Sequence, residues 1–383
     1  MAAYLVRAGQ VFTGDPGGVV FDGAVLVEAD RTVAVGPAGQ VMKAAGPDAF
    51  RLEFPDHTLL PGLIDGHVHL VFSAGTDAVG QYLHDSDAAL LFRAAANARL
   101  ALRSGITLVR DCGGRRNLVL EFRDLVNSGL VAGPRVLACG APITTTGGHC
   151  HFFGLEADSA EEVIKAIRSL AKAGADFIKI MATGGNLTPG SNPRRAQYPA
   201  ETLRAAAEDA HRLGLKVAAH CHGTEGIRAA VAAGVDTIEH CSWLGTAEGF
   251  DFDEAVAAGL VRRGIYVGPT LSVGWAGPNG PVAPAQRLSL TRRLFGLGAR
   301  LFAATDAGVP GTPFNSLTRE LEVYVGELGL SPEQALASAT TVAAAALGVD
   351  KALGRIEAGC LADLVVVRGD PLRRISELKT SSW

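Results

Sequence analysis

Two histidines, His67 and His69, stand two residues apart in the apolar stretch GLIDGHVHL (62–70). Successive side chains of a β-strand point to opposite faces, so both imidazoles project to one side and Val68 to the other. Imidazole nitrogens are good ligands for zinc and neighbouring transition metals. The pair therefore indicates a metal site, although two core histidines that donate to carbonyl groups would have the same spacing.

Four further polar residues stand at the ends of segments that resemble buried strands. They are Lys179 in FIKIM, His220 in AAHCHG, His240 in IEHC and Asp306 in TDAG. A desolvated lysine whose pKa is lowered by nearby metal charge can react with carbon dioxide, and the carbamate can bridge two metals. Two metals would polarise a substrate carbonyl and lower the pKa of a bridging water. Asp306 would bind one metal, accept a proton from that water and deliver it to the leaving group.

Each of these residues also has a purely structural interpretation. Lys179 could extend to solvent or pair with Asp111 or Glu239. His220 and His240 could be hydrogen-bonded core residues, and Asp306 could cap a helix. The metal site is favoured because all six residues fall at strand ends of one repeating pattern.

That pattern is a short β-branched strand, a Gly-containing loop and an Ala-rich helix, repeated from about residue 58. Eight such strands predict an α/β fold in which residues 58–348 form a (β/α)8 TIM barrel. Ser159 and Glu162 form a capping-box pattern before one helix, and Ser331 and Gln334 form another before a single closing helix over 331–348. Active sites of such barrels lie at the carboxyl ends of the strands.

The two ends of the chain depart from the repeat. Residues 1–57 and 349–383 contain short strands separated by Gly and Asp turns, as in AVLVEADRTVAVG and GRIEAGCLADLVVV. We therefore expect both termini to meet in one small β-sandwich beside the barrel.

Composition limits the partners that this chain can have. Its 383 residues carry a net charge of −4, which gives no electrostatic footprint for nucleic acid. No apolar run reaches the 18–20 residues of a membrane span, and the N-terminus lacks a signal-peptide pattern. The six cysteines are scattered, which favours reduced thiols in the cytoplasm. Exposed helical faces of barrels often pair, so a homo-oligomer is an expected assembly.

Other residues near the expected mouth suggest contacts with a substrate. His149 would hydrogen-bond a substrate carbonyl as a catalytic group, and His222 would contact the substrate because the metal ligands are already complete. Arg194 and Arg195 lie in the loop 184–200 and are suited to carboxylate recognition, or are exposed solubilising charges. Three aromatic residues could wall an apolar pocket or simply pack: Tyr198, Trp243 and Trp275.

The stretches GLIDGHVHL, KIMATGG, AAHCHG, IEHC and TDAG together resemble the amidohydrolase superfamily of metal-dependent hydrolases. They are most similar to a branch near imidazolonepropionases and lysine-carboxylated Xaa-Pro/Xaa-Arg dipeptidases, and GRIEAGCLADLVVV resembles terminal strands of that superfamily. The similarity covers nearly the whole chain. It implies two divalent ions, with zinc the expected metal, and N6-carboxylysine as a bridge. The implied ligands are His67, His69 and Asp306 for one ion, His220 and His240 for the other, and carboxylated Lys179 for both.

We therefore expect an enzyme that cleaves an amide bond in a small carboxylate-bearing substrate, such as a dipeptide or an N-acyl amino acid. One alternative is an amidohydrolase that tailors a ribosomally made peptide. Another is a one-metal hydrolase of a cyclic amide or amidine, similar to imidazolonepropionase. Deamination, with Glu225 as the acid–base group, is disfavoured by Lys179. A metal-binding barrel without turnover is the non-enzymatic alternative, and loss of a ligand would be its mark.

Overall fold

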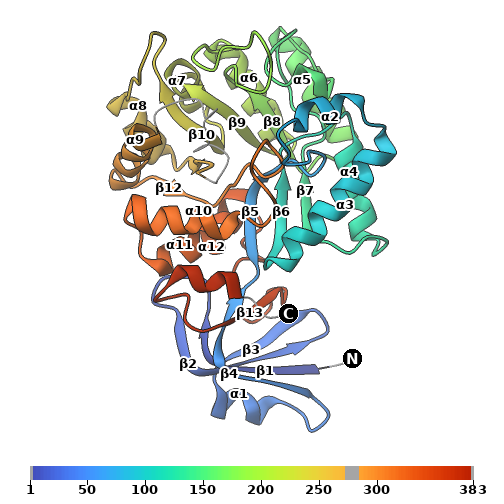
Figure 1. Cartoon of the computed structure of the whole chain (residues 1–383), viewed down its shortest axis with the longest axis vertical. Helices are drawn as coiled ribbons and strands as arrows, with labels where there is room; N and C mark the ends of the chain where they lie inside the picture. The colour runs from blue at the N-terminus through green and yellow to red at the C-terminus, as the bar shows by residue number, and fades with distance from the viewer. Residues whose placement is uncertain (1–2, 272–283, 381–383) are drawn as a thin grey trace.

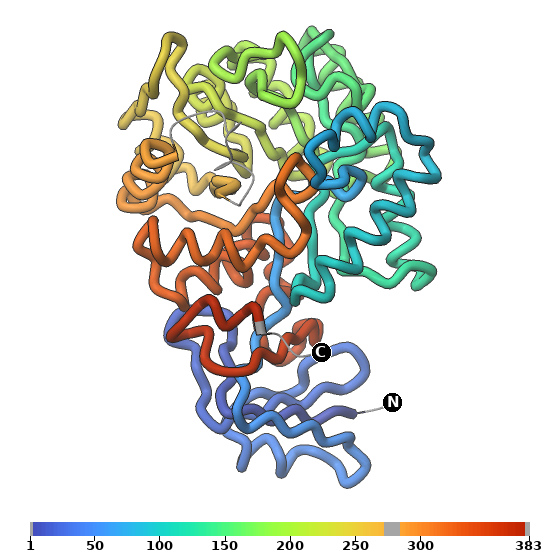
Figure 2. The backbone as a smooth tube through the Cα atoms, viewed as in Figure 1, coloured from blue at the N-terminus to red at the C-terminus, as the bar shows by residue number. Residues whose placement is uncertain are grey.

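The computed structural model describes residues 3–271 and 284–380. It has two parts, a sheet formed by the chain ends and a larger region of alternating strands and helices (Figure 1). A sheet built from both ends of the chain lies at the bottom of the view. Above it, helices surround a set of parallel strands. The backbone trace in Figure 2 shows the C-terminal segment returning to the N-terminal strands.

The terminal sheet has five strands in the order β13-β4-β1-β2-β3. Its elements are β1 (Ala3–Phe12), β2 (Val19–Glu28), β3 (Arg31–Pro37), β4 (Phe50–Pro61) and β13 (Leu364–Arg368), with helix α1 (Ala38–Ala44) following β3. Alternating apolar residues cover both faces: Val25 and Leu59 belong to one buried cluster, and Leu5 and Leu26 pack with Val41 of α1 in another.

Both termini do meet in this sheet, because β13 pairs with β4. The prediction of a β-sandwich requires two facing sheets. Within the described ranges the terminal strands instead make one sheet, with α1 packed on one face. Strand β4 also runs on to Pro61, so the expected boundary at 57/58 falls inside a strand. The β-branched pattern predicted strands but carried no information on how many sheets they share.

The eight expected strands of the central region are all present, and they pair in parallel with their neighbours in each sheet. They are β5 (Leu63–Val68), β6 (Ile106–Asp111), β7 (Arg135–Ala138), β8 (Phe177–Met181), β9 (Lys216–Gly223), β10 (Thr237–Leu244), β11 (Tyr266–Gly268) and β12 (Arg300–Leu301). They form two sheets, β5-β6-β7 and β8-β9-β10-β11-β12. Isolated parallel bridges lie at both seams, between Ile143 and Ile180 and between Val68 and Ala307.

Helices connect these strands and cover them on the outside (Figure 1). They are α2 (Ala78–His84), α3 (Asp87–Arg103), α4 (Leu118–Asn127), α5 (Ala160–Lys172), α6 (Ala200–Arg212), α7 (Thr224–Ala233), α8 (Glu254–Arg263), α9 (Pro284–Gly296), α10 (Leu317–Val323), α11 (Pro332–Ser338) and α12 (Thr341–Leu347). Shorter helical turns lie at His151–Phe153, Tyr324–Leu328 and Ile375–Thr380. The inward faces of α3, α5 and α6 contribute Leu90, Ile167 and Leu203 to the large buried core.

Both predicted capping boxes are present, at Ser159 with Glu162 and at Ser331 with Gln334. The single closing helix predicted over 331–348 is instead two helices, α11 and α12. They are separated at Thr340, whose backbone (φ −134°, ψ −99°) is not helical and whose hydroxyl contacts the carbonyl of Gly14. The hydroxyl of Thr340 also donates to the carbonyl of Leu336 (2.8 Å), and the helix pattern of the sequence continues across this break.

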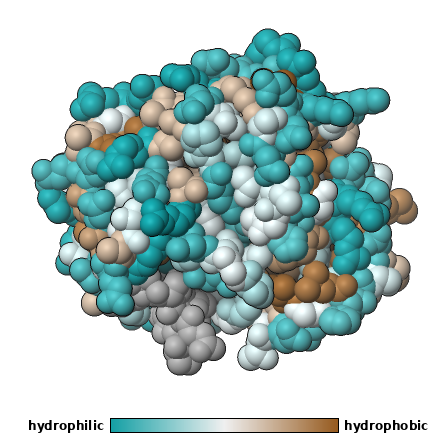
Figure 3. All heavy atoms as spheres, turned by 90° about the horizontal axis from the view of Figure 1, so that it is seen from above, coloured by the Kyte–Doolittle hydropathy of each residue, from teal (hydrophilic) through white to brown (hydrophobic). Residues whose placement is uncertain are grey.

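The end of the molecule seen from above in Figure 3 is mainly hydrophilic, with hydrophobic patches that are small and separate. Among the described residues, no helix has both the length and the apolar character needed to span a membrane.

Candidate metal centre

Six buried imidazoles gather at the ends of the parallel strands, and none is more than 7% exposed. Ring centroids of neighbouring members lie 4.5–5.4 Å apart. They are His67 and His69 at the end of β5, His149 in the loop after β7, His220 and His222 on β9, and His240 on β10. A group of this density among apolar neighbours is unusual for a core, because buried imidazoles lose hydration.

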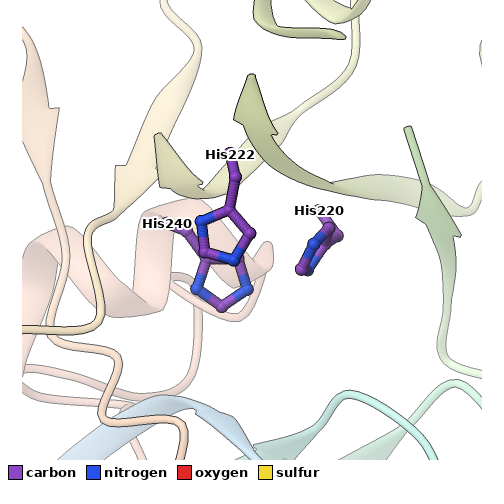
Figure 4. Close-up of side chains that lie close together, drawn as sticks. All are labelled: His220, His222 and His240. Atoms are coloured by element: carbon purple, nitrogen blue, oxygen red, sulfur yellow. The ribbon is translucent and has the colours of Figure 1, made fainter. Parts of the chain in front are cut away.

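Ligand atoms from these residues form two groups of three whose members lie within 4.8 Å of one another. One group is His67, His240 and Asp306, and the other is His220, His222 and His240. Figure 4 shows the second group, with the rings of His222 and His240 stacked and His220 facing them. His240 belongs to both groups. His69 lies at the edge of the first, with Nε2 3.5 Å from Oδ1 of Asp306.

In His69 and His220, a hydrogen bond to a backbone carbonyl determines which ring nitrogen carries the proton and which has a free lone pair. Nδ1 of His69 lies 2.9 Å from the carbonyl oxygen of Gly113, and Nε2 of His220 lies 3.1 Å from that of Gly184. A carbonyl oxygen only accepts, so these nitrogens carry the proton. The lone pairs of a neutral His69 and a neutral His220 therefore lie on Nε2 and Nδ1, respectively.

His67 is oriented by a buried charge network. Its Nδ1 lies 3.0 Å from Glu239, which also accepts from Nη2 of Arg110 and from the hydroxyl of Thr237, both at 2.6 Å. Burial alone would raise the pKa of Glu239, but the charge of Arg110 and the hydrogen bond from His67 hold it well below its usual value. An ionised Glu239 keeps the proton of His67 on Nδ1 and leaves Nε2 free, 3.4 Å from Asp306.

Hydroxyl groups hold the remaining two rings of the second group. Nδ1 of His222 lies 2.9 Å from Oγ of Ser242, and Nδ1 of His240 lies 2.9 Å from Oγ1 of Thr270. In both rings the hydrogen bond occupies Nδ1 and leaves Nε2 for another partner.

Burial keeps these imidazoles in the neutral form that metal ions require. It lowers the pKa of His69 to about 4 and that of His149 to about 3. The pKa values of the other four rings also fall well below the usual value, with burial the largest cause. Burial raises the pKa of Asp306 to about 7, although Lys179 opposes that rise.

Lys179 lies on β8 with its side chain buried, and its Nζ has no hydrogen-bond partner within the described ranges. The structural pairing considered for it is absent: the carboxylate of Asp111 accepts from the backbone N–H groups of Leu70 and Gly113, and Glu239 is engaged as described above. A buried amine without a partner costs free energy. Oδ1 of Asp306 also has no hydrogen-bond partner among the described residues, and the two atoms together fit a site that holds metal ions.

Two of the converging residues have a left-handed backbone, His240 with φ 68° and Asp306 with φ 60°. This conformation costs a non-glycine residue of the order of 1–3 kcal/mol and is concentrated at functional sites. Backbone contacts hold it in place, because the N–H of Asp306 donates to the carbonyl of His67 (2.8 Å) and Arg287 donates to the carbonyl of His240 (3.3 Å).

The left-handed backbone also interrupts the regular alternation of side chains on β10. Regular alternation would put Glu239 and His240 on opposite faces of β10. In the structure Glu239 contacts His67, and the ring of His240 lies 5.3 Å from the ring of His67. Both side chains therefore reach the same histidine, because the strand is irregular after His240.

His149 faces the same centre from a loop. Its ring lies 4.6 Å from that of His220, and its buried Nδ1 has no hydrogen-bond partner in the part of the chain that is described. Gly185 lies against this ring: a Cβ added there would meet ring atoms at 2.4 Å. A glycine is therefore required for His149 to hold this position.

The predicted substrate contacts outside the histidines divide into two sets. Nη1 of Arg194 donates to the carbonyl groups of Gly245, Ala247 and Gly249 at 2.6–2.9 Å, so Arg194 holds a loop rather than offering a free guanidinium. Tyr198 is buried and its hydroxyl donates to the carbonyl of Ala157 (2.7 Å), which corrects its expected place in the pocket wall.

Arg195 remains available, because its side chain is 61% exposed and its ion pair with Glu225 is long, at 3.7 Å. Trp243 is fully buried, and Trp275 lies outside the described residues.

Sequence reasoning missed four supporting residues, and only one of them, Asp65, had a signal in the sequence. Three of them act on partners far away in the sequence: Arg110 on Glu239, Ser242 on His222, and Thr270 on His240. Asp65 accepts from the hydroxyl (2.5 Å) and N–H (3.0 Å) of Thr305 and so fastens the residue before Asp306 to β5. Asp65 stands inside GLIDGHVHL, and its carboxylate in an apolar strand was the available clue.

Comparisons with known proteins agree with this geometry. A family model described as the amidohydrolase family matches residues 58–383. Ochratoxinase from Aspergillus niger is 30% identical over 97% of this chain and 82% of its own length. Imidazolonepropionase from Symbiobacterium thermophilum is 27% identical over 91% and 84%. Among solved structures, a Xaa-Pro dipeptidase with bound methionine in the active site superposes with a TM-score of 0.89 and 29% identity, covering 99% of this chain and 97% of that one.

Proposed function

Because this chain belongs to the amidohydrolase family and is a hydrolase acting on carbon–nitrogen bonds, we propose that it cleaves the amide bond of a small substrate with a free carboxylate, such as a dipeptide or an N-acyl amino acid. The observation that carries this proposal is the buried Nζ of Lys179. It has no hydrogen-bond partner among the described residues, and it interacts electrostatically with four predicted histidine ligands and Asp306.

The proposed architecture is a closed (β/α)8 barrel with the centre at the carboxyl ends of its strands. The parallel bridges at the two seams between the sheets support closure. The hydrogen bonds of Gly66 and His69 with Ala303 and Ala307 support it further, because they join β5 to the segment around β12.

The proposed ligands are His67, His69 and Asp306 for one divalent ion and His220 and His240 for another, with carboxylated Lys179 between them. Two such ions, with zinc proposed, would supply Lewis-acid polarisation of the substrate carbonyl and would lower the pKa of a water molecule. The free amine of Lys179 would react with carbon dioxide to form the N–C bond of a carbamate and release one proton. The side chain of Lys179 is buried, and its Nζ has no hydrogen-bond partner among the described residues that would compete with this reaction.

The chain's own residues then handle protons and substrate. One carboxylate oxygen of Asp306 accepts no hydrogen bond from the described residues, and we assign it to accept the proton of the attacking water and return it to the leaving nitrogen. His149 has a buried ring nitrogen without a described partner, and we assign it to hydrogen-bond the carbonyl oxygen of the scissile amide. Arg195 would bind the substrate carboxylate.

Arg195 gives a direct test of the substrate class. We expect Arg195→Gln to raise KM about tenfold or more for a dipeptide with a free carboxylate and to leave KM unchanged for the C-terminal amide of that dipeptide. Arg204→Gln on the exposed surface of α6 is the matched control. Equal KM changes for the acid and the amide would exclude carboxylate recognition by Arg195.

A second candidate is the hydrolysis of a cyclic amide, suggested by the similarity to imidazolonepropionase. A steady-state screen of dipeptides, N-acyl amino acids and cyclic amides separates the two candidates: turnover of cyclic amides alone would replace the proposal. Peptide tailoring, a cytoplasmic location and a homo-oligomer remain predictions from the sequence.

A further inference from the structure

We propose that His220, His222 and His240 form a complete site for one divalent transition-metal ion, which this site takes up without Lys179. The inference deepens the proposed function, because it concerns the same centre, but it changes the role of His222 from a substrate contact to a metal ligand. It also assigns an order: this three-histidine site is filled first, and the second ion follows carboxylation of Lys179.

The positions of the three rings follow from two neighbouring strands. His220 and His222 repeat on β9 the spacing of His67 and His69 on β5, so their side chains share one face. His240 pairs in register with Cys221, the residue between them. Regular alternation would turn His240 away with Cys221, but its left-handed backbone brings its ring to the two others.

The rings form a compact triangle. Centroids lie 4.7 Å apart for His220 and His222, 4.5 Å for His220 and His240, and 4.5 Å for His222 and His240 (Figure 4). All three rings are buried, and one ligand atom of each lies within 4.8 Å of those of the others.

Each ring has one nitrogen bound to the protein and one available. The bound atoms are Nε2 of His220, held at Gly184, and Nδ1 of His222 and of His240, held at Ser242 and Thr270. Three neutral imidazoles with a fourth position open are a ligand set that zinc accepts in catalytic sites. Neighbouring groups that orient such rings raise metal affinity.

His240 limits the number of ions, because it is shared by both groups of three. Its one available nitrogen has a single lone pair and can bind one ion only. A second ion would be held by His67, His69 and Asp306, and carboxylated Lys179 would supply its fourth ligand. Without carbamate, we expect one ion per chain.

The experiment is a titration of chelator-stripped protein with Co²⁺ in buffer depleted of carbon dioxide, followed by the visible absorption of bound Co²⁺ and by elemental analysis. Lys179→Ala prevents carbamate formation. In this background we compare His222→Ala, Asp306→Ala and the control His151→Ala, which removes an exposed histidine next to the site loop. Thermal melts followed by circular dichroism report whether each variant folds.

We expect Lys179→Ala to bind one Co²⁺. Adding His222→Ala should weaken binding more than about a hundredfold, because loss of a ligand exceeds the 10–100-fold effect of losing a group that orients one. Adding Asp306→Ala or His151→Ala should change affinity less than about tenfold.

Equal affinities for the His222→Ala and His151→Ala forms would overturn the role of His222. A larger loss with Asp306→Ala would place the ion on the other group and also overturn it. A Lys179→Ala protein that folds but binds no Co²⁺ would show that the carbamate is required, again overturning the three-histidine site. The proposed function would survive each of these results if the wild-type chain binds two ions with bicarbonate. If the wild type binds no metal, both the three-histidine site and the proposed function are rejected.

Discussion

The carboxylate of Glu239 accepts a hydrogen bond from Nδ1 of His67 at 3.0 Å, and both side chains are buried. This contact keeps the other nitrogen of His67 directed at Asp306. The same carboxylate pairs with buried Arg110, so one side chain supports both the metal centre and the interior of the fold.

We expect Glu239→Gln to weaken metal binding about 10–100-fold, because an amide holds His67 less well than a carboxylate does. It should also lower the free energy of unfolding by about 3–5 kcal/mol, because Arg110 remains buried without its counter-charge. Metal titration and urea unfolding measure the two effects. Glu53→Gln is the control: its ion pair with Arg7 is exposed, so we expect a change within about 0.5 kcal/mol and no effect on metal. Wild-type metal affinity in Glu239→Gln would contradict the orienting role.

Gly185→Ala tests the position of His149. The added methyl group would meet the His149 ring at 2.4 Å, so the ring must move. We expect kcat/KM to fall about tenfold or more while metal content stays at the wild-type value, because His149 is assigned to the substrate carbonyl rather than to a metal. Gly39→Ala on α1, where an added Cβ meets nothing within 4 Å, is the control. An unchanged kcat/KM in Gly185→Ala would remove His149 from the mechanism.

Asp209 provides a prediction about acid stability. Arg168 on α5 donates two hydrogen bonds to its carboxylate (3.0 and 3.1 Å), and Arg212 contacts it as well. The hydrogen bond from Arg168 is the largest cause that holds the pKa of Asp209 below its ordinary value. A lowered folded-state pKa contributes stability above the unfolded pKa, and that contribution is lost as pH falls through the folded-state pKa.

Asp209→Asn should therefore cost about 1 kcal/mol at neutral pH, with the difference from wild type shrinking below about pH 4. Urea unfolding at a series of pH values measures it, with exposed Glu208→Gln as the control. A difference that stays constant down to pH 2 would contradict the ionic origin of the effect.

Features that depend on neighbours in the sequence were accessible without a structure. Strand alternation predicts the shared face of His67 and His69, and cap residues predict the starts of α5 and α11. The eight parallel strands follow from the repeated pattern of β-branched segments and helices, and the family resemblance is confirmed by the match over residues 58–383.

Features that depend on distant contacts were not accessible. The left-handed backbone of His240 breaks the regular alternation of β10, so that Glu239 and His240 both reach His67. Arg194 and Arg195 are adjacent and chemically equal in the sequence, yet carbonyl groups about 50 residues away engage only Arg194. Within the described part of the chain Nζ of Lys179 has no hydrogen-bond partner, which likewise depends on where Asp111 and Glu239 find other partners.

The central claim is that Lys179 completes a two-metal centre. The most direct measurement is metal per chain, by elemental analysis of protein purified without chelator and with bicarbonate, for wild type and Lys179→Ala. We predict close to two equivalents for wild type and close to one for Lys179→Ala. About one equivalent in both proteins would contradict the claim and indicate a one-metal hydrolase in which Lys179 takes no part.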